Sequence, residues 1–139
     1  MLTEIAFAAK RHWGYPEKWI QRWKEVLTIQ PEFIRCHEIY IACIEEKTVG
    51  FYALAGGLNR MALEHLWVLP KDMGQGVGRA LFDHAVRRAK ALGVEVIEIE
   101  SDPNAEKFYE RMGARRIGAN ISELEGKPRA LPVLIYDCR

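Results

Sequence analysis

Apolar residues near the N-terminus recur with the spacing of amphipathic helices. Residues 4–11 and 16–27 follow this pattern, and Tyr15-Pro16 separates them. Pro16 suits the first turn of the second helix, because the N–H that proline lacks would have no helical partner there. The stripe predicted to be buried on the second helix consists of Trp19, Ile20, Trp23, Val26 and Leu27.

Two later segments also have a helical pattern. Residues 78–92 form the clearest helix, and Gly93 suits the position that follows a helix end. A shorter helix is expected after Asp102, which can act as its N-cap, with Pro103 at its first position and Gly113 at its end. The apolar face of the longer helix is formed by Leu81, Phe82, Ala85, Val86, Ala89 and Leu92.

Six segments have the pattern of β-strands. Three of them, 38–45, 48–55 and 61–68, are joined by short turns and predict an antiparallel meander. The other three strands are 94–100, 114–123 and 131–137. A helix connects the third strand to the fourth, so these two should be parallel, with a right-handed crossover. The predicted order is ααβββαβαββ, an α/β fold with a mixed, mostly antiparallel sheet flanked by helices.

Composition and charge narrow the class of protein. The chain has 139 residues, the size of one domain, with 20 Lys and Arg against 19 Asp and Glu. The formal net charge of +1 gives no support to a nucleic-acid partner. No apolar run approaches the ~20 residues that a membrane span needs, and the N-terminus lacks a secretory pattern. We expect a single domain over residues 1–139, located in the cytoplasm, with no nucleic-acid or membrane partner.

The cysteines and histidines indicate neither disulfide bonds nor a metal site. The three cysteines, Cys36, Cys43 and Cys138, are scattered and form no CxxC pair, which favours a reducing compartment. The four histidines also lack the spacing of metal ligands; they are His12, His37, His65 and His84. We therefore expect no bound metal.

Three glycines at alternate positions stand between a predicted strand and the clearest helix. They are Gly74, Gly76 and Gly78 in the segment LWVLPKDMGQGVGRALF, residues 66–82. Glycine reaches positive φ without penalty and leaves no Cβ in the way of a ligand. Successive backbone N–H groups at a helix start can then converge on an anion such as a pyrophosphate. The alternative is a turn that is merely rich in glycine.

Two known nucleotide motifs can be tested against this segment. The Walker pattern GxxxxGK[ST] has no match in the chain. The dinucleotide pattern GxGxxG fails because Leu81 stands where the third glycine would follow Gly76 and Gly78. Glu95 or Glu98 could still serve as its ribose-binding acid, so an NAD-dependent dehydrogenase remains a weaker alternative.

The segment VLPKDMGQGVGRAL resembles the acyl-CoA-binding motif of the GNAT (Gcn5-related) N-acetyltransferases, Q/R-x-x-G-x-G/A after a strand. Met73 stands where that family prefers Gln or Arg. NAEKFYERMGARRIG resembles the family segment N-x-x-A-x-x-FY-x-x-x-GF, although Ala105 directly follows Asn104 here. The similarity covers about residues 38–137. The chain also resembles a small, uncharacterised bacterial subgroup of the family.

The resemblance implies the GNAT fold and acetyl-CoA as acyl donor. Family members normally begin with a strand before the first helix, so we expect this leading edge strand to be absent, or reduced to residues 1–3. The resemblance assigns CoA binding to Leu66, Trp67, Val68, Met73, Gly74, Gln75, Gly76, Val77, Gly78, Arg79, Asn104 and Phe108. The spacing of Phe108 and Met112 also fits a buried helix stripe, and Asn104 could simply bond backbone N–H groups at a helix start.

Two residues are expected to take part in catalysis. Tyr109 matches the family tyrosine that protonates the departing thiolate, and a phenol of pKa ~10 is protonated at neutral pH. Glu64 is a candidate general base, acting through water, or else an ordinary solvent-facing acid. The N–H of Val68 is a candidate donor to the developing oxyanion. His65 points to the other face of the strand and is expected to be a packed or surface histidine rather than a functional one.

The acceptor is expected to be a primary amine of a small molecule, because the near-zero net charge does not suit a large charged protein surface. The segment around residues 11–19 is rich in aromatic and cationic groups, and His12, Trp13 and Tyr15 are candidate acceptor contacts. Trp19 and Trp23 are expected in the core. The other functional alternative is a catalytically silent, CoA-binding interaction domain with the GNAT fold, and a homodimer is left open.

Overall fold

The computed structural model describes residues 1–139, and its strands form one six-stranded sheet in the order β1-β2-β3-β4-β6-β5. The strands are β1 Glu38–Ile44, β2 Lys47–Gly56, β3 Arg60–Val68, β4 Val96–Glu100, β5 Arg115–Leu124 and β6 Lys127–Asp137. β3 and β4 pair in parallel, whereas β1–β2, β4–β6 and β5–β6 pair antiparallel. The mixed, mostly antiparallel sheet predicted from the sequence is confirmed. The dehydrogenase alternative is wrong, because it requires a mainly parallel sheet.

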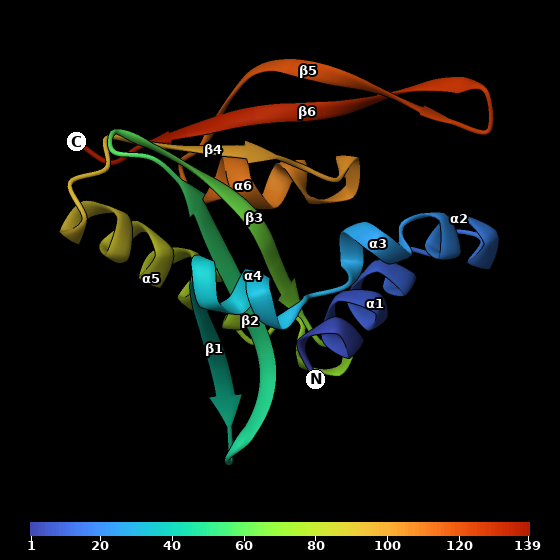
Figure 1. The fold of residues 1–139 in the computed structure, drawn as a ribbon, viewed down its shortest axis with the longest axis horizontal. Coiled ribbons are helices and arrows are strands. Elements are labelled where there is room, and N and C mark those ends of the chain that lie inside the picture. Colours follow the sequence, from blue (N-terminus) through green and yellow to red (C-terminus); the bar gives the residue numbers. More distant parts are fainter. The chain divides into compact units, whose positions relative to one another are not determined.

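Six α-helices and two short 3₁₀ helices complete the fold (Figure 1). The helices are α1 Leu2–His12, α2 Glu17–Arg22, α3 Lys24–Leu27, α4 Pro31–Cys36, α5 Val77–Ala91 and α6 Glu106–Arg111, with η1 Pro70–Asp72 and η2 Pro103–Ala105. Every predicted helix and strand has a counterpart, and the largest shift of a boundary is four residues, at the start of β6. No helix is both long and apolar enough to cross a membrane.

Two details near the N-terminus differ from the sequence prediction, and a third agrees with one of its alternatives. The helix predicted over 16–27 is divided at Trp23, whose N–H reaches the carbonyls of both Trp19 and Ile20. Val26 consequently leaves the predicted stripe and is 70% exposed. The helix α4 was not predicted. Residues 2 and 3 belong to α1, so residues 1–3 are not the remnant of a leading strand.

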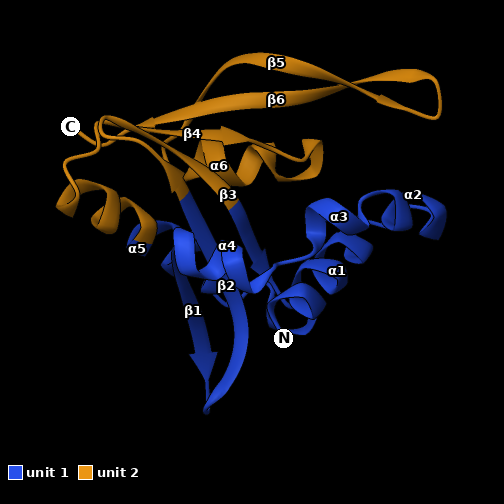
Figure 2. Cartoon of the chain, in the orientation of Figure 1, with its two compact units in different colours: residues 1–54, 65–84 blue, residues 55–64, 85–139 orange.

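The chain divides into two compact units (Figure 2). The first comprises residues 1–54 and 65–84, and the second comprises residues 55–64 and 85–139. The second unit contains the β3–β4 pairing from Arg60 to Ala62, together with α6 and the long β5–β6 hairpin.

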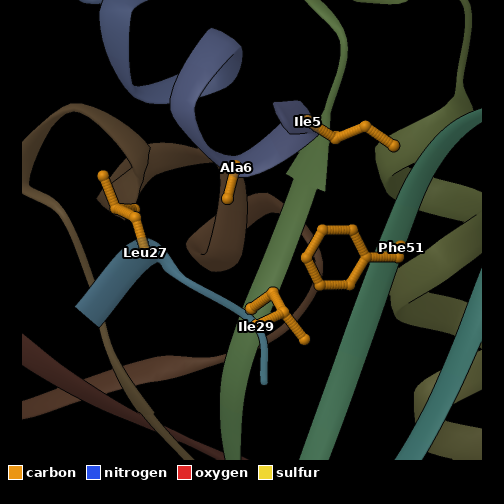
Figure 3. Packing of buried hydrophobic residues seen from close by; sticks show 5 residues of the cluster. All are labelled: Ile5, Ala6, Leu27, Ile29 and Phe51. Atoms are coloured by element: carbon orange, nitrogen blue, oxygen red, sulfur yellow. The ribbon is translucent and has the colours of Figure 1, made fainter. Parts of the chain in front are cut away.

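The core of the first unit lies between β2 and the N-terminal helices. Ile5 and Ala6 of α1 and Leu27 of α3 surround Phe51, with Ile29 beside them (Figure 3). Tyr52, the next residue of β2, points to the opposite face because side chains alternate along a strand. Its hydroxyl lies 2.8 Å from Nδ1 of His84 on α5. The N-terminal helices and α5 therefore cover opposite faces of β2.

Candidate functional site

The sequence-predicted site residues are distributed over both compact units. The first unit holds the end of β3, the glycine loop and the N-terminal aromatic residues. The second unit holds Glu64, Asn104, Phe108 and Tyr109.

The glycine loop connects β3 to α5 by way of η1. Gly74 has φ +79° and Gly76 has φ +82°, both in the left-handed region that glycine reaches without strain. A Cβ built on either residue meets no atom within 4 Å. Both positions therefore require glycine for the backbone conformation, and both border open space that a ligand could occupy. Two of the three glycines, Gly74 and Gly76, thus take the backbone geometry expected of them, whereas Gly78 does not have a positive φ.

The first turn of α5 follows this loop directly. The carbonyl of Gly76 accepts the N–H of Ala80 at 3.0 Å, so the N–H groups of Val77, Gly78 and Arg79 precede the first helical hydrogen bond. The helix begins at Val77, one residue earlier than predicted, so Gly78 lies inside its first turn. The N-terminal end of a helix carries partial positive charge, and together with the open loop it can bind a phosphate anion.

The other residues of the loop offer few polar side chains to a ligand. Met73 ends η1, donates its N–H to Pro70 and is half-buried. Gln75 is exposed, and its amide reaches the carbonyl of Lys71 at 3.5 Å. Val77 is buried and Arg79 is exposed. Any grip on a phosphate must therefore come mainly from the backbone, with Arg79 as the available cation.

The end of β3 carries a buried histidine beside the residues expected to face the pantetheine arm. Leu66 and Trp67 are half-buried, and Val68 is buried. The indole N–H of Trp67 donates to Nδ1 of His65 at 2.9 Å, which places the proton of a neutral His65 on Nε2. Burial lowers the pKa of His65 to about 4. Of the two structural positions expected for His65, packed or at the surface, the structure shows the packed one, and the imidazole is uncharged at neutral pH.

The aromatic residues after α1 form two separate groups. His12 and Trp13 are both exposed, and their ring centroids lie 5.4 Å apart. Tyr15 instead packs edge-on against Trp23 at 5.0 Å and near Trp19 at 6.0 Å. The ammonium of the buried Lys10 lies 4.3 Å from the Trp23 ring centroid and 5.1 Å from that of Tyr15. The structure therefore brings His12 and Trp13 together but places Tyr15 with the half-buried Trp19 and Trp23.

Tyr109 is the buried residue of α6 in the second unit. It is 7% exposed, and the ring of half-buried Phe108 packs against it edge-on at 5.2 Å. Burial and the nearby charge of Asp102 both raise the pKa of the phenol well above its ordinary value. Tyr109 is therefore a weaker acid than the sequence argument assumed, and it stays protonated across the physiological range.

The start of α6 is organised around Asp102, a residue that sequence reasoning used only as a cap. The N–H and the side-chain amide of Asn104 both donate to Oδ1 of Asp102, at 2.9 and 3.0 Å. Arg129 of β6 approaches Oδ2 of the same carboxylate at 3.5 Å. Sequence reasoning missed Arg129, because nothing in the spacing of a distant strand indicates that it meets this turn.

Glu64 is exposed on β3. Period-two alternation places it on the face opposite His65. Glu64 is therefore exposed to solvent, which is compatible both with a general base that acts through water and with an ordinary surface acid.

The comparisons with known proteins agree with this geometry. Residues 15–125 match the family described as an acetyltransferase (GNAT) domain. A peptidyl-lysine N-acetyltransferase of Salmonella typhimurium, YjaB, is 34% identical over 92 residues, which is 66% of this chain. The chain spans only 59% of the length of that relative.

Solved structures show the same fold. A GCN5-related N-acetyltransferase from Rhodopseudomonas palustris matches with a TM-score of 0.80 and 21% identity, over 98% of this chain and 87% of that one. The PaiA N-acetyltransferase of Thermoplasma acidophilum, in complex with coenzyme A, matches with a TM-score of 0.76 and 18% identity, over 98% of this chain and 90% of that one. The family match covers most of the chain, and the chain therefore belongs to the GNAT acetyltransferase family.

Proposed function

We propose that this protein is an acetyl-CoA-dependent N-acetyltransferase that acts as a single domain and acetylates a primary amine of a small molecule. The observation that carries the proposal is the glycine loop, in which Gly74 and Gly76 adopt positive φ beside open space at the start of α5. In a chain of this family, such a loop fits the pyrophosphate of CoA. The presence of CoA in the related PaiA structure supports the same cofactor.

In the proposed reaction, backbone groups bind the CoA, and side chains assist the transfer of the acetyl group. The N–H groups of residues 74–79 hold the pyrophosphate, and the backbone of 66–68 pairs with the pantetheine arm. The N–H of Val68 donates to the thioester oxygen as negative charge develops on it, and this fixed dipole needs no reorganisation. Tyr109 donates to the departing sulfur. Glu64 accepts the proton of the incoming amine through water.

The acceptor is proposed to be a small primary amine, with His12 and Trp13 as its aromatic contacts. The net charge of +1 favours a small molecule over a strongly charged protein surface. The Salmonella relative is named for lysine side chains in peptides, which are also primary amines. A panel of small amines and one lysine-containing peptide, read by thiol release from acetyl-CoA, separates these acceptors. Turnover of the peptide alone would contradict the small-molecule proposal.

A catalytically silent CoA-binding domain is the second candidate, because Met73 replaces the polar residue that the family prefers at the loop. Calorimetry with CoA, acetyl-CoA and NAD tests the binding step separately from turnover. We expect CoA and acetyl-CoA to bind and NAD not to bind. CoA binding without thiol release for any amine would favour the silent domain, and no CoA binding would contradict both candidates.

The proposed location is the cytoplasm. Cys36 and Cys43 are exposed free thiols, and Cys138 is a buried one. Exposed unpaired thiols suit a reducing compartment, where they resist oxidation. Fractionation of cells followed by immunodetection would test this location, and recovery outside the cytoplasm would contradict it.

A further inference from the structure

The β5–β6 hairpin of the second unit is longer than the strand that supports it. β6 runs from Lys127 to Asp137, but β4 pairs with it only from Val133 to Asp137. The rest of the hairpin continues past the end of β4 as a two-stranded ribbon (Figure 2). A two-stranded hairpin is marginally stable by itself in water, because it lacks a third strand or a helix to cover it. A further neighbour would therefore stabilise this ribbon.

Two side-chain contacts hold the base of the ribbon, and its tip lies beyond them. The amide of Asn120 donates to the Glu100 carboxylate at 2.7 Å, and the guanidinium of Arg129 lies 3.5 Å from the Asp102 carboxylate. The tip comprises residues 121–128, of which only one is buried. These polar contacts thus anchor the ribbon and leave its tip available to a partner.

The outer edge of β5 has few of the features that keep edge strands apart. β5 is the last strand of the sheet, so no strand of this chain pairs with its outer backbone N–H and C=O groups. It contains neither proline nor lysine, and its bulge, between Arg116 and Gly118, leaves residues 118–124 regular. Nine of its ten residues are exposed. A long, regular and exposed edge of this kind is a template for pairing with another strand.

The exposed side chains of β5 include two large apolar residues beside a hollow. Ile117 is 48% exposed and Ile121 is 70% exposed. A hollow of about 290 Å³ lies at the tip of the hairpin, and Ile121 and Glu123 are among the residues that line it. The hollow therefore offers an apolar group and an acidic group to a partner.

The two ends of β5 carry opposite charges that form no salt bridge in this structure. Arg115 lies at the start of the strand and Glu123 near its end, and both are exposed. Arg116, next to Arg115, is already paired with Glu106 at 3.2 Å. An antiparallel pair of β5 strands would put the start of each strand against the end of the other. Each Arg115 would then meet the Glu123 of the second copy, so the strand is complementary to itself.

This complementarity also defines a register. A two-fold axis at Ala119 places Arg115 of one copy opposite Glu123 of the other, because each lies four residues from Ala119. The same register brings Ile117 of one copy to Ile121 of the other, and so to the hollow. The bulge displaces the arginine by about one residue, roughly 3.3 Å, which its long side chain can span.

The opposite edge of the sheet lacks this complementarity. β1 has a single charged residue, Glu38, so two copies of it would have no opposite charges to pair. Its bulge, between Ala42 and Cys43, leaves a shorter regular stretch than the one in β5. Ile41 of β1 is nevertheless 50% exposed, and it is therefore a matched control for Ile121.

We propose that the outer edge of β5 binds the same edge of a second copy, in antiparallel register about a two-fold axis at Ala119, so that one sheet runs through a homodimer. Pairing gives each ribbon the further strand that it lacks, buries Ile117 and Ile121, and forms a salt bridge between Arg115 and Glu123 at each end of the interface. The interface is isologous, because both copies contribute the same residues. The proposal does not depend on the acetyltransferase reaction.

Charge reversal tests the two ends of the strand. Sedimentation equilibrium of the full chain over a range of concentrations should show a reversible dimer. Arg115→Glu or Glu123→Arg alone sets like charges against each other at both ends of the interface, and should raise the dimer dissociation constant at least about 10-fold. The double variant R115E/E123R restores opposite charges and should return the constant to near its wild-type value. A monomeric wild type, or a folded double variant that dimerises as weakly as the single variants, would overturn the proposal.

A lysine on the edge tests the middle of the strand. Ile121→Lys should give a monomer, because its charge would lie against the apolar Ile117 of the other copy. Ile41→Lys makes the same change at an exposed isoleucine of β1 and should leave the dimer intact. Dissociation by I41K but not by I121K would place the interface at the other edge of the sheet and overturn the proposal.

Cysteine cross-linking tests the register. In a chain with Cys36→Ser and Cys43→Ser, which removes both exposed thiols, Ala119→Cys should oxidise to a covalent dimer. Residues that face each other across the axis have Cα atoms about 4.5–5.5 Å apart, within the range of a disulfide bond. Ser122→Cys, three residues from the axis, leaves the two cysteines about 20 Å apart and should run as a monomer on a denaturing gel without reductant. Cross-linking at Ser122 rather than at Ala119 would overturn the register and, with it, the proposal.

Discussion

The glycine loop of the first unit and the turn from Asp102 to Tyr109 in the second unit differ in the groups that they offer to the proposed reaction. In the loop, Gly74 and Gly76 are exposed and offer only backbone to a ligand. In the turn, the Asp102 carboxylate and the Tyr109 phenol are buried side chains. A site made of backbone tolerates a change of side chain, whereas a site made of buried charge depends on the identity of each residue.

This difference bears on Met73, the departure from the family pattern at the loop. Met73 replaces a polar residue there, but the backbone N–H groups at the start of α5 are unaffected by its side chain. In the turn, by contrast, the charge of the buried Asp102 carboxylate is met by Arg129 at 3.5 Å. We therefore expect Met73 to have little effect on CoA binding, whereas a substitution of a buried side chain in the turn should have a large effect.

The largest effect is expected from Gly76→Val. The side chain would project into the open space where the diphosphate is proposed to bind, and CoA affinity should fall by at least about 100-fold, which corresponds to ~2.7 kcal/mol. Isothermal calorimetry with CoA measures the loss. Retained affinity would show that the loop is only a turn.

The matched control for this substitution is Gly126→Val. Gly126 lies in the β5–β6 turn with φ +76°, and a Cβ there also meets no atom within 4 Å. The left-handed backbone strain, ~1–2 kcal/mol, should therefore be similar at the two positions. Equal losses of CoA affinity in both variants would point to general destabilisation.

The next effect is expected from Tyr109→Phe, which tests the turn. Removing the hydroxyl deletes one donor to the sulfur and changes packing little, so kcat should fall about 10- to 100-fold while the CoA dissociation constant stays nearly constant. Steady-state kinetics and calorimetry on the same preparation separate the two quantities. If affinity falls and kcat does not, the division between a binding loop and a catalytic turn is wrong.

The sequence predicted the loop better than the turn for a physical reason. Alternating glycines specify backbone geometry locally, and Gly74 and Gly76 indeed take positive φ. The strands also follow from their local patterns, and the parallel pairing of β3 with β4 follows from the helix that connects them. The environment of Asp102 depends on Arg129, 27 residues away along the chain, and that of Tyr109 depends on burial. A local pattern contains neither.

The N-terminal helices show the same limit on a smaller scale. Helical spacing predicted that Val26 would be buried with Leu27, yet Val26 is 70% exposed and Leu27 is 2% exposed. The break at Trp23 rotates the stripe, and it depends on how Tyr15, Trp19 and Lys10 pack around that ring. Such packing is not visible in the spacing alone. Among the candidate acceptor contacts, Tyr15 packs in this same cluster, whereas His12 and Trp13 pack with each other.

Acid pH should act on the first unit through His65. Its pKa is about 4 in the folded protein and 6.5 ordinarily, so above pH 6.5 both states are neutral and stability is complete. As the pH falls, the unfolded chain takes up a proton that the folded protein excludes. The free energy of unfolding should therefore drop by about 2 kcal/mol between pH 7 and pH 5, and the loss should level off below pH 4.

Urea unfolding at pH 7 and pH 5 measures this loss of free energy of unfolding in the wild type and in the variant His65→Gln. Glutamine keeps an acceptor for the Trp67 indole, which His65 binds at 2.9 Å, but cannot titrate in this range. The free energy of unfolding should fall by about 2 kcal/mol more in the wild type than in the variant, because the other titrating groups contribute equally to both. Parallel pH dependences would show that folding does not lower the pKa of His65.

The smallest effect is expected from Tyr52→Phe, the same chemical change as Tyr109→Phe made in the other unit. Tyr52 is fully buried, and its hydroxyl lies 2.8 Å from Nδ1 of His84, while its ring stacks on Tyr40. The ring packing remains in the variant and one hydrogen bond is lost, so unfolding should become easier by about 1 kcal/mol. Turnover should not change, because this hydroxyl lies outside the proposed chemistry. Urea unfolding and steady-state kinetics check both statements, and a fall in kcat as large as that of Tyr109→Phe would mean that a buried phenol affects catalysis through the fold rather than through its proton.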